Sequence, residues 1–173
     1  MAVIEQIIQE DRLTFHFPAN AMASKYDEWT HYRRQFNGAF GGTKAVDILY
    51  VENSIGWLIE IKDYRIECKI SATDLADVVA LKVRDTLAGL VSANLHAYDQ
   101  DERRVARKFL GCRKLRVVLH VEQPEKKSKL RPQAIDPAAV LQKLKGQVKA
   151  IDPHPSVVSQ NNLKATMQWR VEG

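Results

Sequence analysis

Two apolar segments joined by a short polar stretch constrain the fold of this chain more than any other feature. Residues 45–51 and 57–64 are rich in β-branched and aromatic side chains, and residues 52–56 between them end in glycine. This pattern predicts a β-hairpin. Because both strands are almost continuously hydrophobic, we expect them to lie in a sheet that helices cover on both faces.

The segments around this hairpin predict an alternation of helices and strands. We expect a short N-terminal helix carrying Ile4, Ile7 and Ile8, a strand at 13–17 and a helix at 19–36. Further along we expect a long helix from Ser71 to about Leu95, then a strand, a helix and an edge strand at 115–121, 136–152 and 165–171. The order indicates an α/β or α+β fold with a mixed sheet, and 173 residues fit a single domain, 1–173.

Three charged residues interrupt the apolar strands of the hairpin. Asp47 lies in the first strand, and Glu60 and Lys62 lie in the second. If Glu52 pairs with Trp57, Asp47 faces Lys62, and Glu60 shares that face because side chains alternate along a strand. A shift of the register by two residues keeps the trio together, whereas a shift by one separates it.

Burying these charges without partners is costly, so the trio needs a physical explanation. A divalent cation bound by Asp47 and Glu60 offsets the cost, and oxygen ligands favour Mg²⁺ or Mn²⁺. Lys62 then lies where it stabilises negative charge on a phosphate or orients a water. The alternative is a structural salt bridge between Lys62 and one of the carboxylates.

Asp47 followed by Glu60-Ile61-Lys62 on the next strand resembles the signature of the restriction-endonuclease-like, or PD-(D/E)xK, nuclease superfamily. The resemblance covers residues 20–121 and implies an αβββαβ core. It also implies that Asp47, Glu60 and the Ile61 carbonyl bind the metal while Lys62 assists the attacking water. Where many members have proline, this chain has Val46, and an acid on the preceding helix would have to be Asp27 or Glu28.

The distribution of charge suggests a nucleic-acid partner. Residues 1–100 carry 10 Lys/Arg and 14 Asp/Glu, whereas residues 101–149 carry 14 and 5, for net charges of −4 and +9. We expect the basic segment to contact phosphates, although the same residues also suit a merely solvated surface. The candidate contact residues are Arg103, Arg104, Arg107, Lys108, Lys126 and Lys127, and Lys82 is a further candidate near the acids.

Together these features predict a cytoplasmic, metal-dependent nuclease that hydrolyses phosphodiester bonds, with DNA as the expected substrate. No apolar segment is long enough to cross a membrane. The lack of an identifiable target-recognition domain favours a homodimer or a partner subunit. The competing hypotheses are a non-catalytic nucleic-acid-binding or protein-assembly module on the same scaffold, and an interaction protein in which the motif arose by chance.

Overall fold

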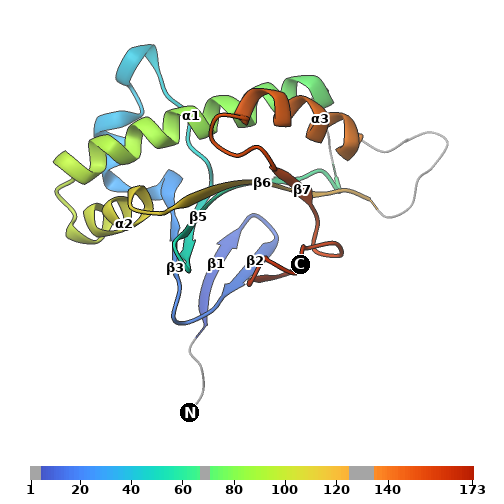
Figure 1. Ribbon diagram of the computed structural model, residues 1–173, viewed down its shortest axis with the longest axis horizontal. Coiled ribbons are helices and arrows are strands. Elements are labelled where there is room, and N and C mark those ends of the chain that lie inside the picture. Colours follow the sequence, from blue (N-terminus) through green and yellow to red (C-terminus); the bar gives the residue numbers. More distant parts are fainter. Residues whose placement is uncertain (1–4, 67–70, 125–134) are drawn as a thin grey trace.

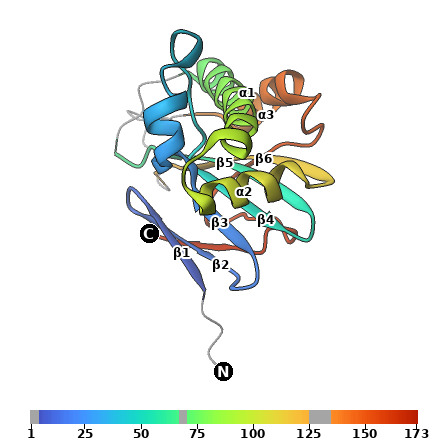
Figure 2. The same cartoon turned by 90° about the vertical axis from the view of Figure 1, so that its left-hand side faces the viewer.

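The protein consists of three layers in the computed structural model, which describes residues 5–66, 71–124 and 135–173. A five-stranded sheet forms the middle layer, helices cover one of its faces, and a three-stranded sheet covers the other (Figures 1 and 2). The prediction of an α+β fold with a mixed sheet flanked by helices is therefore confirmed. The prediction of helices on both faces is wrong.

The five-stranded sheet has the order β3-β4-β5-β6-β7. The first three strands form an antiparallel meander, whereas β5, β6 and β7 run parallel to one another. The parallel pairing requires crossover connections, which the helices provide. The strands are β3 (Met22–Lys25), β4 (Ile48–Glu52), β5 (Ile55–Asp63), β6 (Lys114–Glu122) and β7 (Ser156–Val158).

Helices α1 (Ala72–His96), α2 (Gln100–Leu110) and α3 (Pro137–Val148) pack on one face of this sheet. Each begins at a side chain that accepts hydrogen bonds from the free amides of its first turn, namely Ser71, Asp99 and Asp136. The capping residues and the apolar periodicity explain why the predictions for α1 and α3 are confirmed. Figure 1 shows α1 and α3 lying across β5, β6 and β7.

The opposite face packs against the small sheet β1-β2-β8, whose strands are Gln6–Glu10, Leu13–Phe17 and Arg170–Glu172. Aromatic rings fill the space between the two sheets. Phe17 contacts Tyr50 with ring centroids 4.8 Å apart, and Trp57 meets Trp169 at 5.1 Å. These large side chains make this layer a second hydrophobic core, separate from the core beneath the helices.

Two predicted helices are absent from the described residues; Ile4, which the first was expected to carry, lies outside them. The predicted N-terminal helix is replaced by β1, which pairs with β2 through a turn at Asp11, where φ is 50°. The predicted helix at 19–36 is replaced by β3 and by short helical turns at Tyr26–Glu28 and Tyr32–Phe36. Pairing with neighbouring strands outweighed local helix propensity in both places.

The restriction-endonuclease-like αβββαβ core is not confirmed, because its first helix is missing and a second sheet covers one face. The predicted C-terminal strand at 165–171 is largely wrong, since only Arg170–Glu172 pairs as β8. In the described ranges, no helix is long and apolar enough to span a membrane.

Candidate functional site

A tight turn sets the position of the charged trio. Glu52 pairs with Ile55, so the hairpin turn contains only Asn53 and Ser54. Both have positive φ, 49° and 61°, as a type I′ turn requires. The predicted pairing of Glu52 with Trp57 is therefore wrong by two residues.

The observed register places Asp47 beside Glu60 rather than opposite Lys62. Ile48 pairs with Ile59, and Asp47 comes one residue before Ile48. Because the shift is by two residues, the three charged side chains stay together on the face that α1 covers.

Buried Glu60 is the centre of a charge cluster. Its Oε1 accepts hydrogen bonds from Lys62 Nζ at 2.5 Å and from Lys82 Nζ on α1 at 2.7 Å. Lys82 Nζ also lies 3.6 Å from Asp47 Oδ1. Lys82 therefore faces the acids, as the sequence suggested, and its ammonium group bridges the two carboxylates.

Asp47 is held by the neighbouring backbone as well as by Lys82. Its Oδ2 accepts a hydrogen bond from the Ile61 amide at 2.6 Å. Helix α1 fixes the segment that leads into Asp47, because Asp85 accepts from the Lys44 amide and Thr86 accepts from the Val46 amide. Asp85 and Thr86 were missed by the sequence analysis, although two buried polar residues on an apolar helix are a signal of such a role.

The electrostatics of the cluster shift the pKa values of its members. Burial and the negative charge of Asp47 raise the pKa of Glu60 to about 7, against the opposing effect of both lysines. Burial lowers the pKa of Lys62, but the Glu60 carboxylate outweighs it and the net shift is upward. These shifts favour a charged Lys62 and a partly protonated Glu60 near neutral pH.

The acids fit a divalent cation only in part. Glu60 Oε2 is buried and has no hydrogen-bond partner within the described residues, so one oxygen remains for a ligand. However, the described ranges contain no group of three or more His, Cys, Asp or Glu side chains placed to hold a metal. Lys82 and Lys62 already neutralise the two carboxylates, which is a sufficient reason for the acids to be buried.

Of the two acids considered as additional ligands, Asp27 lies nearer the cluster. Burial and the charge of Asp47 raise the pKa of Asp27 to about 6, and its Oδ1 is buried without a hydrogen bond. Glu28 instead forms ion pairs with Lys25 and Arg33. Neither lies on a regular α-helix, because Tyr26–Glu28 forms a single 3₁₀ turn.

Four of the six predicted phosphate-binding residues lie on α2. Arg103 donates to the Ala97 carbonyl and so helps end α1, while Arg104 pairs with Asp101. Arg107 and Lys108 are exposed in the last turn of α2. Lys126 and Lys127 lie outside the described residues.

The structure does not bring Arg107 and Lys108, at the end of α2, to the charge cluster. Phe109 at the end of α2 packs closely against Gly56, near the start of β5. Glu60 is four residues further along the strand, or about 13 Å. The basic end of α2 and the charge cluster are thus separate features.

The comparisons with known proteins found one curated relative and no matching family model. The chain is 39% identical over 166 residues to a cysteine–tRNA ligase of Neisseria meningitidis serogroup A. The match covers 78% of this chain but 24% of the ligase, so the chain spans about a quarter of its relative's length. No protein-family model matches the chain, and no solved structure matches it.

This similarity overturns the functional predictions made from the motif. A domain related to part of a tRNA ligase is indicated, and the assignments to the PD-(D/E)xK superfamily, to a metal-dependent nuclease and to a phosphodiesterase are wrong. Salt bridges from two lysines account for the buried acids without any hydrolytic role. The predictions of DNA as partner, of a homodimer or partner subunit and of a cytoplasmic location stay predictions.

Proposed function

We propose that this chain is a tRNA-binding domain related to part of a cysteine–tRNA ligase. The observation that carries the proposal is the 39% identity to that ligase over 166 residues. Because the match covers 24% of the ligase, we assign the chain a binding role within aminoacylation and not the complete ligase reaction.

The last turn of α2 and the residues after it supply the surface for this role. Arg107, Lys108, Arg113 and Lys114 are exposed and follow one another within eight residues; we call them the α2 basic patch. No ion pair involves any of them within the described residues, so their charges remain available to phosphates. Such contacts add affinity without reading sequence.

A direct binding measurement tests the proposal. Fluorescence anisotropy with labelled cysteine-accepting tRNA is compared between the wild type and the double variant Arg107→Gln/Lys108→Gln. We expect the variant to bind about tenfold more weakly at low salt. The plot of log affinity against log salt concentration should be less steep by about 2, because two phosphate contacts are lost.

A matched control separates a specific surface from net charge. Lys145→Gln/Lys149→Gln removes two exposed charges from the region of α3 and should leave the affinity within about twofold of wild type. Equal losses in the two double variants would contradict an α2 surface. Equally tight binding of a DNA duplex of the same length would instead support the DNA partner expected from the sequence.

We also propose that Asp47 and Glu60, with the Ile61 carbonyl, bind one Mg²⁺ or Mn²⁺ ion. The buried, unpartnered Glu60 Oε2 supports this site. When bound, such an ion supplies positive charge beside Lys62 and Lys82, where a phosphate of the RNA would be attracted.

Thermal unfolding with and without the ion tests the cation site independently of any activity. Saturating Mn²⁺ should raise the Tm of the wild type by several degrees and leave Asp47→Asn unchanged, since a ligand that binds only the folded state stabilises it. Glu28→Gln, which removes an exposed acid outside the cluster, should respond as the wild type does. Equal shifts in all three proteins would contradict the site.

A further inference from the structure

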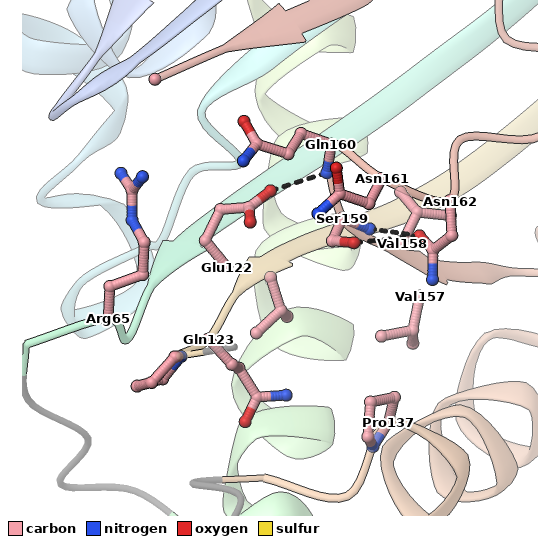
Figure 3. Close-up of a pocket in the computed structure, with 13 residues that line it drawn as sticks. Arg65, Glu122, Gln123, Pro137, Val157, Val158, Ser159, Gln160, Asn161 and Asn162 are labelled. Atoms are coloured by element: carbon pink, nitrogen blue, oxygen red, sulfur yellow. Dashed lines mark hydrogen bonds between the residues drawn. The ribbon is translucent and has the colours of Figure 1, made fainter. Parts of the chain in front are cut away.

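A polar pocket opens where the three parallel strands β5, β6 and β7 end (Figure 3). Its volume is about 570 Å³, within the range of sites that hold small ligands. In open α/β sheets, ligands commonly bind beyond the carboxyl ends of parallel strands. Glu122 points to the opposite face of the sheet from the charge cluster, because it alternates with Val121 and Leu119, which pack under the helices.

Glu122, the last residue of β6, forms part of the wall as a fixed carboxylate. The residue is almost fully buried, at 4% exposure. His120 Nε2 and the Gln160 amide both donate to Oε1 at 2.7 Å, so Oε2 takes part in neither bond. A carboxylate held in this way is a directed acceptor for an amino group of a ligand.

Arg65 supplies positive charge at the same pocket. Its Nε and Nη2 donate to the two oxygens of Asp63 at 2.8 and 2.7 Å, which fixes the plane of the guanidinium group. Nη1 takes part in neither bond, so it presents a donor edge suited to a phosphate. In Figure 3, Arg65 stands across the pocket from the segment that carries Asn161 and Asn162.

The amide side chains of the pocket fall into two groups. Gln123 is engaged with both the amide and the carbonyl of Ile135, and Asn162 Oδ1 accepts from Ser159. The side-chain amides of Gln160 and Asn161 have no hydrogen bond within the described part of the chain. Figure 3 shows the Gln160 side chain extending over Glu122.

These groups match the parts of a nucleotide. A carboxylate beside an amide complements a base edge that carries an amino group. In nucleic-acid recognition, carboxylates accept a hydrogen bond from the N4 amino group of cytosine, and side-chain amides form paired hydrogen bonds with adenine. A guanidinium group complements a phosphate. The valine and proline side chains in the wall, Val157, Val158, Pro124 and Pro137, offer apolar surface to the base and sugar.

We propose that this pocket binds one nucleotide whose base carries an exocyclic amino group, with Glu122 and Gln160 contacting the base and Arg65 contacting the phosphate. The proposal is independent of tRNA binding by the α2 basic patch, because the pocket is at the other end of β6. The nucleotide is either free or an unpaired residue of an RNA, and the chemistry of recognition is the same.

Calorimetric titration of the full chain with CMP, UMP, AMP and cytidine tests the proposal. CMP should bind about tenfold more tightly than UMP, which replaces the amino group with a carbonyl oxygen that faces Glu122 unfavourably. CMP should also bind several-fold more tightly than cytidine because of its phosphate. Equal affinities for CMP and UMP, or no binding of either CMP or AMP at millimolar concentration, would overturn the proposal.

Variants assign the contacts. Arg65→Gln should abolish the advantage of CMP over cytidine, and Glu122→Gln should abolish the preference for CMP over UMP. Because Glu122 also accepts buried hydrogen bonds, Gln160→Ala serves as a second variant that retains the Gln160 backbone donor. It should weaken CMP binding several-fold, and Lys145→Gln should have no effect; unchanged CMP binding in Gln160→Ala and Arg65→Gln would refute the assignment.

A final comparison separates the two sources of the nucleotide. Short single-stranded RNAs that differ only in an unpaired C or U are titrated beside the mononucleotides. A C-over-U preference in the RNAs as well as in the mononucleotides identifies an RNA residue as the ligand. A preference confined to the mononucleotides identifies a free nucleotide, and absence of any preference in either series contradicts the pocket's proposed chemistry.

Discussion

Glu60 and Glu122 are buried carboxylates on adjacent parallel strands, yet their surroundings shift their pKa values in opposite directions. Glu60, at 0% exposure, faces the helices, and its pKa is raised to about 7. Glu122, at 4% exposure, faces the other layer. Burial alone raises the pKa of Glu122, but the His120 hydrogen bond, the Gln160 amide and nearby positive charge outweigh burial and lower it.

The difference shows that the donors and the neighbouring acid decide the ionisation, rather than burial alone. Glu60 has two lysine partners, but Asp47 lies close enough to oppose its charge. Glu122 has no carboxylate among the groups that shift its pKa, and a backbone amide donates to it at no cost in side-chain entropy. Measuring the stability of variants at Glu60, at Glu122 and at the partly buried Asp27 tests this explanation.

The largest effect is expected at Glu60. Glu60→Ala leaves Lys62 without an ion-pair partner and Lys82 with Asp47 alone, so it should lower the free energy of unfolding by about 3 kcal/mol at pH 8. Urea unfolding measures the loss. Adding Lys62→Met removes the ammonium group that Glu60 had paired and should recover about 1 kcal/mol; a double variant no more stable than the single one would contradict the ion pair between Lys62 and Glu60.

A smaller effect is expected at Glu122. Glu122→Ala leaves the His120 ring and the Gln160 amide without their acceptor, at a cost of about 2 kcal/mol near pH 7. Since the folded-state pKa of Glu122 is lowered, its ionisation stabilises the fold above pH 4.5 and the benefit is lost as the pH falls through the folded-state pKa. Unfolding curves between pH 3 and 8, in steps of about one unit, should therefore show the cost shrinking in acid. A cost independent of pH would argue that packing alone is responsible.

The smallest effect is expected at Asp27, and it has the opposite sign. The pKa of Asp27 is raised from 3.8 to about 6, so its ionisation destabilises the fold as the pH rises between these values. Asp27→Asn should be more stable than wild type by about 1 kcal/mol above pH 6, after allowance for its partial exposure. The two proteins should be equal below about pH 4.

Thermal melts across this pH range, in buffer containing a chelator, measure the difference. Glu28→Gln is the matched control, because Glu28 is paired with Lys25 and Arg33 nearby. An Asp27→Asn variant that is less stable than wild type at pH 8 would show that Asp27 has a partner when ionised, contrary to its buried and unbonded Oδ1.

The sequence predicted the parts of the fold whose information is local. The hairpin, α1, β6 and α3 carry their own apolar periodicity, and the two helices also carry capping residues, Ser71 and Asp136. Even the grouping of the charged side chains followed from alternation along the strands, because a register error of two residues preserves the face.

What the sequence did not predict depends on contacts between distant segments. Residues 6–10 read as a helix, but they pair with β2, which in turn pairs with β8 at the other end of the chain. The pocket at Glu122 needs β5, β6 and β7 to end together, and no short motif encodes this. The predicted function failed for a related reason, since a short acidic motif is equally compatible with a structural ion-pair network.

The length of the two-residue turn at Asn53 and Ser54 decides which side chains of β5 face the helices and which face the small sheet. One added residue there would exchange the two faces of β5 relative to β4, directing Glu60 towards the aromatic rings of the small sheet and a neighbouring isoleucine towards Lys82. Glu60 would then be buried among aromatic rings without its hydrogen bond from Lys82. The length of this turn should therefore be far less tolerant of change than the identity of its two residues.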